Sequence, residues 1–225
     1  MLRQDLPRPI PAAIEMLPRD RGYPVPWFVA WLAEDDTPLP QGIGKPDFRV
    51  ISPGAIQEAI EFGLCWICGR RRSLTTSSAF NIGPMCAVNR VSAEPPSHVA
   101  CADWAARACP FLTKPKMERR ENDLPEDAKE PAGIMFRRNP GVALVWLSKT
   151  MRVIGPPGGG ILFHVGEPTQ IRFYCEGREA TREEILESIN SGLPLLQELA
   201  DEQGVEAQTA LKQQTEAAME LLPAS

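Results

Sequence analysis

Five of the six cysteines and one of the two histidines in this 225-residue chain lie between residues 65 and 109. In chain order these residues are Cys65, Cys68, Cys86, His98, Cys101 and Cys109. Two residues separate Cys65 from Cys68, and two separate His98 from Cys101, which is a spacing at which paired side chains bind one metal ion. The pattern predicts a structural site for Zn²⁺. Such a site requires both pairs to meet in the fold.

The residues around each pair predict how it is presented. Gly69 follows the first pair and permits a tight turn, a zinc knuckle, in which backbone N–H groups point at sulfur. Ser97 precedes the second pair and predicts a helix N-cap before the helix-forming segment 98–108. His98 and Cys101 then share one face of the first helical turn. With a hairpin-like apolar segment at 79–83 between the pairs, residues 65–109 resemble a treble-clef zinc finger.

Two ligand sets remain open. Cys65, Cys68, His98 and Cys101 follow the treble-clef plan, which leaves Cys86 and Cys109 as small buried residues. Replacing His98 by Cys86 gives a four-cysteine set that is also chemically acceptable and frees the histidine. A redox Cys-x-x-Cys pair is a third interpretation, but such a pair normally ends a strand and opens a helix, whereas Cys68 leads into a turn.

The net charge of −5 is unevenly distributed. Residues 1–44 carry −2, residues 45–120 carry +5 and residues 121–225 carry −8. The cysteine-rich region is therefore the basic part of an acidic chain, which permits DNA or RNA to bind there through phosphate contacts. The candidate contact residues are Arg70, Arg71, Arg72 and Arg90. For three consecutive arginines, an ordinary solvated turn is the alternative.

The N-terminal half is expected to combine strands with the zinc finger. Residues 1–26 form a proline-rich, irregular arm, and residues 27–112 form a strand–helix unit that includes the finger. Strands are predicted at 27–31 and 48–51. A helix is predicted over 52–62, capped by Ser52 and stopped by Gly63.

A polar segment at 113–133 predicts a linker, and residues 134–225 a small antiparallel sheet followed by helices. The strands are expected at 134–137, 142–147, 161–165 and 171–175. Thr181 to Glu184 is a capping box, and helix breaks are expected at Gly192 and near Gly204. The predicted class is α+β, with a treble-clef-like N-terminal half and a C-terminal helical hairpin. That hairpin is a candidate surface for a protein partner or a homo-oligomer.

Alternation in the last two strands places three polar residues where they could share a face: His164, Arg172 and Tyr174. An ordinary solvated face is the favoured interpretation, because nothing at fixed spacing links them to a nucleophile or a carboxylate pair.

Several longer segments resemble a family of uncharacterised bacterial and bacteriophage proteins over nearly the full chain. These are residues 24–28 (PVPWF), 82–91 (IGPMCAVNRV), 95–98 (PPSH) and 192–196 (GLPLL). The resemblance implies a bacterial or phage cytosolic setting and one co-folded unit, and it implies no activity. The N-terminus, with four prolines by position 18 and no apolar stretch after it, predicts no signal peptide, and no run approaches the length of a membrane span. A cytoplasmic location is expected.

Two functional classes follow. The first is a non-catalytic, zinc-stabilised protein that binds nucleic acid or protein. The second is a metal-dependent nuclease of the His-Me type, in which four cysteines hold the zinc and His98 acts as general base with Asn81 or Asn89 nearby. The first is favoured, because His98 stands where a zinc ligand belongs.

Overall fold

The computed structural model describes residues 2–73, 75–114, 117–118, 139, 141–155 and 159–223. These residues contain six helices and twelve strands. The strands form one four-stranded sheet, two three-stranded sheets and one two-stranded ladder. The mixed helical and antiparallel architecture agrees with the α+β prediction. The predicted strand at 134–137 and most of the predicted linker fall outside the described residues.

The central sheet is antiparallel throughout and has the strand order β12–β11–β8–β6. Its strands are β6 (Ser78–Ile82), β8 (Ala143–Ser148), β11 (Pro168–Cys175) and β12 (Arg178–Glu179). Strand β6 comes before the polar segment 113–133 and β8 comes after it, yet they pair directly, with Phe80 opposite Trp146. One sheet therefore contains chain from both sides of that segment.

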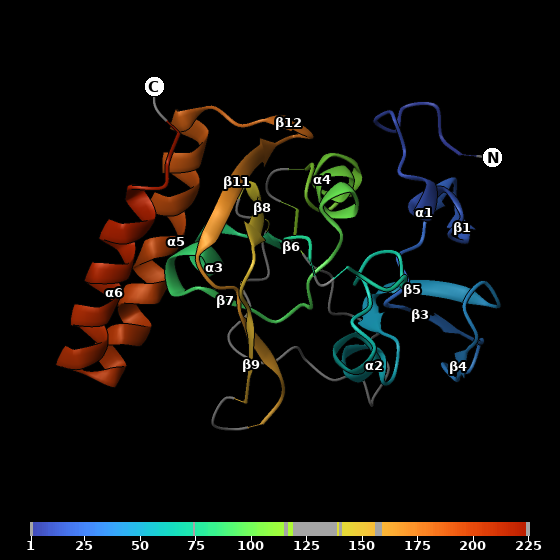
Figure 1. Ribbon diagram of the computed structural model, residues 1–225, viewed down its shortest axis with the longest axis horizontal. Coiled ribbons are helices and arrows are strands. Elements are labelled where there is room, and N and C mark those ends of the chain that lie inside the picture. Colours follow the sequence, from blue (N-terminus) through green and yellow to red (C-terminus); the bar gives the residue numbers. More distant parts are fainter. Residues whose placement is uncertain are drawn as a thin grey trace.

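Both faces of this sheet are covered by helices (Figure 1). Helix α4 (Val99–Ala108) packs on one face against small and apolar residues of the strands. Helices α3 (Pro84–Asn89), α5 (Arg182–Gln203) and α6 (Val205–Met219) cover the other face, where Phe80 and Trp146 are almost fully buried. Because side chains alternate along a strand, Tyr174 lies with the α4 layer and Phe173 with the α5 layer, as predicted.

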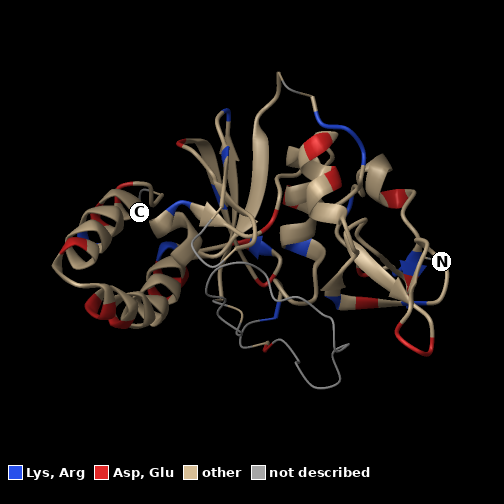
Figure 2. Ribbon diagram, turned by 90° about the horizontal axis from the view of Figure 1, so that it is seen from below, with Lys and Arg blue, Asp and Glu red and all other residues tan. Residues whose placement is uncertain are grey.

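The C-terminal helices form the expected hairpin, which carries many acidic side chains (Figures 1 and 2). The capping box of Thr181 and Glu184 is present, and the chain turns at Gly204 with φ +97°. The predicted break at Gly192 is wrong, because α5 continues through it to Gln203. A Cβ atom at Gly192 would lie 2.7 Å from the Cγ of Met85, so this glycine permits close packing of α5 on α3.

The N-terminal half contains a second sheet, β4–β3–β5, beside a short helix. Its elements are β3 (Val29–Leu32), β4 (Pro38–Leu39), β5 (Lys45–Ile51) and α2 (Ala55–Glu61). Strands β3 and β5 fit the predicted ones, but the helix begins later than expected. Gly54, with φ +81°, takes the N-cap position, and the Ser52 carbonyl accepts a hydrogen bond from Ala55 in a turn, so Ser52 is not the cap.

Residues 2–26 contain α1 (Ala12–Glu15) and a small ladder of β1 (Arg19–Asp20) and β2 (Tyr23–Pro24), joined by turns and extended chain. The remaining sheet, β7–β10–β9, comprises β7 (Val91–Ser92), β9 (Arg152–Ile154) and β10 (Leu162–His164). His164 therefore lies in a different sheet from Arg172 and Tyr174, so the three residues do not share the face that alternation allowed. Among the described helices, none combines the length and apolar character needed to cross a membrane.

Candidate metal centre

Cys65 and Cys68 lie in a tight turn after α2. The Cys65 N–H donates to the Arg70 carbonyl, and the Gly69 N–H donates to the Cys65 carbonyl, both at 2.8 Å. Gly69 has φ +69°, and a Cβ atom there would lie 2.5 Å from the indole ring of Trp27. Glycine is thus required at this position both for the backbone conformation and for the close approach of Trp27.

His98 and Cys101 lie at the start of α4. The N-cap is His98 rather than the predicted Ser97, and no side chain caps the helix. The reason lies in the backbone of Ser97, which exchanges two hydrogen bonds with Ala79 at the start of β6. Ser97 is therefore held in an extended bridge to β6, and the helix begins one residue later than expected.

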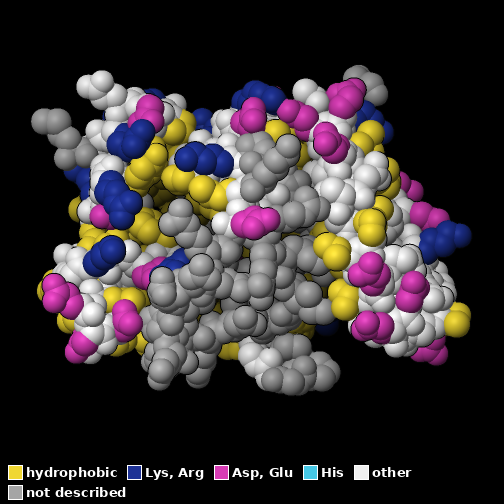
Figure 3. All heavy atoms as spheres, turned by 180° about the vertical axis from the view of Figure 1, so that it is seen from behind, with side chains coloured by type: hydrophobic (Ala, Val, Ile, Leu, Met, Phe, Trp, Pro, Cys, Tyr) yellow, Lys and Arg dark blue, Asp and Glu magenta, His cyan; other side chains and the backbone are white. Residues whose placement is uncertain are grey.

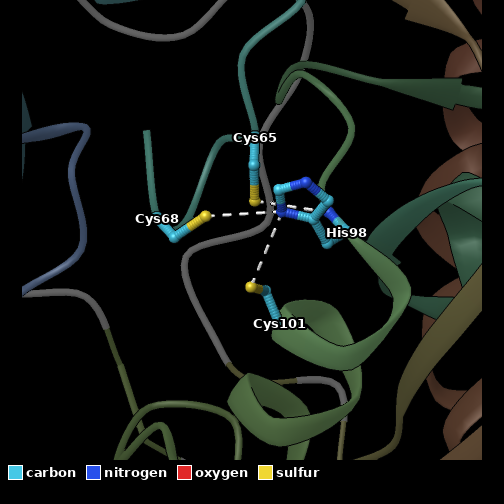
Figure 4. A group of neighbouring side chains, drawn as sticks. All are labelled: Cys65, Cys68, His98 and Cys101. Atoms are coloured by element: carbon cyan, nitrogen blue, oxygen red, sulfur yellow. Dashed lines mark hydrogen bonds between the residues drawn. The ribbon is translucent and has the colours of Figure 1, made fainter. Parts of the chain in front are cut away.

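The fold brings the two pairs together (Figure 4). One ligand atom from each of Cys65, Cys68, His98 and Cys101 lies within 4.8 Å of all the others, and we call this group the Cys3His cluster. The His98 Nδ1 atom is 3.4 Å from the Cys68 Sγ and 3.9 Å from the Cys101 Sγ. A zinc tetrahedron with Zn–S of about 2.3 Å and Zn–N of about 2.0 Å has S···N edges of about 3.5 Å. The cluster is close to that size and could hold a metal ion.

Groups around the cluster orient its ligands. The second ring nitrogen of His98, Nε2, lies 3.3 Å from the Arg71 carbonyl oxygen, which is the kind of partner that fixes a metal-binding imidazole. The His98 backbone N–H donates to the Cys65 Sγ at 3.3 Å. Both ring nitrogens of His98 therefore face partners, Nδ1 toward the sulfurs and Nε2 toward the carbonyl.

The three thiols are buried, with exposed fractions of 0% for Cys65, 6% for Cys68 and 2% for Cys101. Hydrogen bonds from the thiols of Cys101 and Cys68 lower the pKa of Cys65 far below its usual range, against the effect of burial. The same contacts with Cys65 and Cys68 raise the pKa of Cys101 strongly. Without a cation, the thiolate form is thus favoured at Cys65 and disfavoured at Cys101. A divalent cation would remove this conflict by stabilising all three.

The N-terminal segment covers the cluster. Its apolar side chains pack in one core with the cluster cysteines and with Trp104 of α4, and they are Leu6, Ile10, Ile14 and Leu17. The Trp104 indole Nε1 donates to the Pro7 carbonyl at 2.9 Å. Residues 1–26 were not assigned to the site by sequence, because their apolar residues are spaced irregularly between prolines.

Cys86 and Cys109 lie elsewhere. Cys86 is on α3 and packs against the core on the α5 side of the central sheet, where burial raises its pKa to about 11. Cys109 caps the C-terminal end of α4, and burial raises its pKa as well. The structure therefore does not bring the alternative ligand Cys86 to the cluster, because β6 separates the knuckle from α3. Between the two pairs, the described strands do not form the expected hairpin, because β6 pairs with β8 and β7 pairs with β10.

The four arginines chosen from the sequence have different roles. Arg72 is half-buried and donates to the Leu64 carbonyl and to the Ser78 hydroxyl. The Arg90 side chain is 15% exposed, stacks 4.6 Å above the Trp146 ring and contacts Glu167. Arg70 and Arg71 are exposed at the rim of the knuckle, where they contact Met16 and the Phe62 carbonyl.

A polar network that the sequence did not predict joins α4 to the central sheet. Asp103 Oδ1 accepts hydrogen bonds from the Tyr174 hydroxyl at 2.5 Å and from Arg172 at 2.9 Å, and Arg107 lies 3.5 Å from the other carboxylate oxygen. The sequence indicated only part of this network. Strand alternation predicted that Arg172 and Tyr174 share a face, but it did not predict that Asp103 is their partner.

Comparison with models of protein families, with curated proteins and with solved structures finds no match to this chain. The resemblance to a bacterial and bacteriophage family therefore stays a prediction.

Proposed function

We propose that the Cys3His cluster is a structural zinc site and that the chain is a non-catalytic binding protein stabilised by it. The observation that carries the proposal is the convergence of four ligand atoms, three sulfur and one nitrogen, in one buried place. Thiolate and imidazole ligands in a four-coordinate arrangement are those that zinc prefers.

The closed geometry favours a structural role. A catalytic zinc keeps one position open for water or substrate, whereas this cluster offers four ligands and lies beneath the N-terminal segment. Zinc would join the knuckle to helix α4, and the apolar side chains of the N-terminal segment pack against the cysteine ligands. The knuckle and the ligand pair on the first turn of a helix support a treble-clef-like arrangement, in which β6, α3 and β7 replace the usual hairpin.

We propose nucleic acid as the partner, bound through the exposed rim of the knuckle. Arg70 and Arg71 support this proposal, because both guanidinium groups lie at the surface of the basic part of the chain. Arg72 and Arg90 are partly buried against Ser78 and against Trp146, and are assigned a structural role instead. On the face seen in Figure 3, acidic side chains predominate over the C-terminal helices, which disfavours phosphate binding there.

No observation favours the nuclease alternative. It requires a free imidazole at His98, but both ring nitrogens face partners. Its candidate metal ligands are also engaged, since Asn81 donates to the Ala102 carbonyl and Asn89 accepts from the Val91 N–H.

The test is native mass spectrometry of the purified chain with elemental analysis, run on the parent and on two cysteine variants. The parent is expected to carry one zinc, Cys65→Ser none, and Cys86→Ser one. A folded parent without metal would refute the proposal. Loss of zinc in Cys86→Ser would instead support the four-cysteine set.

A further inference from the structure

A surface pocket of about 200 Å³ lies between the β4–β3–β5 sheet and the start of α2. Residues from both elements line it, among them Trp27, Val29, Trp31, Leu39, Ser52 and Glu58. A pocket of this size admits a small head group. None of these residues belongs to the Cys3His cluster.

The aromatic side of the pocket is held rigidly. The Trp27 backbone N–H donates to the Ile67 carbonyl at 2.8 Å, and its ring lies against Gly69 and edge-on to Trp66 at 6.3 Å. Trp31 is 5% exposed, and within the described residues its indole N–H has no acceptor. Two tryptophans thus form part of a preformed wall.

One carboxylate, that of Glu58, lies among the lining residues of the pocket. It is exposed at the helical side, and no ion pair between described residues includes it. The β3–β4 loop, which follows Trp31 closely, carries the exposed residues Glu34, Asp35 and Asp36, against Lys45 on the neighbouring strand. A carboxylate at the pocket attracts cations and repels phosphate.

We propose that this pocket binds an alkylammonium cation, with the tryptophan rings against its methyl groups and Glu58 as counter-ion. Tryptophan is the aromatic side chain that attracts cations most strongly. Moving a quaternary ammonium from water to an aromatic surface costs less hydration free energy than moving a primary ammonium. A methylated cation is therefore expected to bind better than free lysine. The carrier is either a methylated lysine of a partner protein or a free quaternary compound such as choline.

The experiment follows the five tryptophan indole N–H signals of the intact protein by two-dimensional NMR during titration. Choline and an acetylated trimethyllysine amide are the two probes, and whichever binds more tightly identifies the carrier class. The signals of Trp27 and Trp31 are expected to shift with millimolar affinity, while those of Trp104 and Trp146 stay in place. Glu58→Gln should weaken binding at least fivefold. Glu61→Gln, at another exposed carboxylate on α2, which does not line the pocket, should change the affinity less than twofold.

The uncharged isostere of choline, 3,3-dimethylbutan-1-ol, decides whether charge matters. It is expected to bind at least tenfold more weakly than choline. Equal affinity for the two, equal weakening by both glutamate variants, or no indole shift with either cation would overturn the proposal. Cluster variants are not used in this test, so its outcome is independent of the zinc assignment.

Discussion

The Nδ1 atom of His98 lies 3.4 Å from the Sγ atom of Cys68, although 30 positions separate the two residues in the chain. This distance is close to one edge of a zinc tetrahedron. It joins the knuckle after α2 to the first turn of α4.

The first prediction concerns His98 itself. His98→Ala should weaken zinc binding by at least tenfold, because one ligand is lost, whereas His98→Cys should retain stoichiometric zinc. Competition with a colorimetric chelator measures both. If His98→Ala keeps full zinc affinity and a magnesium-dependent DNA cleavage by the parent disappears, the histidine is catalytic and the proposed function is wrong.

The second prediction concerns the knuckle rim. Reversing two charges in Arg70→Glu/Arg71→Glu should weaken binding to a short DNA or RNA duplex by at least tenfold at 50 mM salt. Parent affinity should itself fall about tenfold between 50 and 200 mM salt if two phosphates are neutralised. Lys149→Glu/Arg152→Glu, an exposed pair outside the knuckle, supplies the same change in net charge. Equal loss in both double variants, measured by fluorescence anisotropy, would show a nonspecific charge effect.

The third prediction distinguishes two reasons why a position requires glycine: a left-handed backbone conformation and the close approach of a neighbouring side chain. Gly63 and Gly69 both have positive φ, but only Gly69 is in close contact with a neighbour, Trp27. Gly63→Ala should cost about 1 to 2 kcal/mol in free energy of unfolding, from the left-handed backbone alone. Gly69→Ala should cost about 1 to 3 kcal/mol more, from overpacking, and should weaken zinc binding. Urea denaturation measures the difference, and equal costs would contradict the close approach of Trp27.

The fourth prediction concerns the contact between α5 and α3. Gly192→Leu should destabilise the protein by about 1 to 3 kcal/mol, because its side chain would overlap Met85. Combining it with Met85→Ala should cost less than the sum of the single changes, by about 1 kcal/mol or more, since the cavity accepts the new side chain. Strict additivity in a double-mutant cycle would mean that the two helices do not meet at these residues.

The fifth prediction is an alkaline pH dependence from Tyr174. Burial, followed by its hydrogen bond to Asp103 and the charge of that carboxylate, raises the pKa of Tyr174 to about 12. Because the folded state holds this proton more tightly than the unfolded chain, the stabilisation is complete below about pH 10 and is lost as the pH rises toward 12.

The free energy of unfolding should therefore fall across that window in the parent. Tyr174→Phe should be less stable at pH 7, by about 2 kcal/mol for a hydrogen bond to a charged group, and should show a smaller alkaline loss. Urea denaturation at pH 7, 10 and 11 checks both points. Parallel pH curves for parent and variant would rule out Tyr174 as the source.

Short-range features were predictable from the sequence because their geometry is set within a few residues. The pairs Cys65–Cys68 and His98–Cys101 each lie within one turn, and their chemistry favours a shared cation. The capping box at Thr181 and the alternation of Phe173 and Tyr174 are local in the same sense. The ligand pairs, the main strands and the C-terminal helices could therefore be found by pattern alone.

Only the tertiary structure decided which segments meet. Strand β6 has apolar residues on both faces, and pattern could not tell that its partner is β8 rather than β7. That pairing puts Cys86 on the opposite side of the sheet from the knuckle and so leaves His98 in the cluster. Likewise Gly192 permits either a helix end or a close helix contact, and the presence of Met85 selects the contact. The physical reason is common to these cases: spacing sets the local conformation, but burial against distant residues chooses among the conformations it allows.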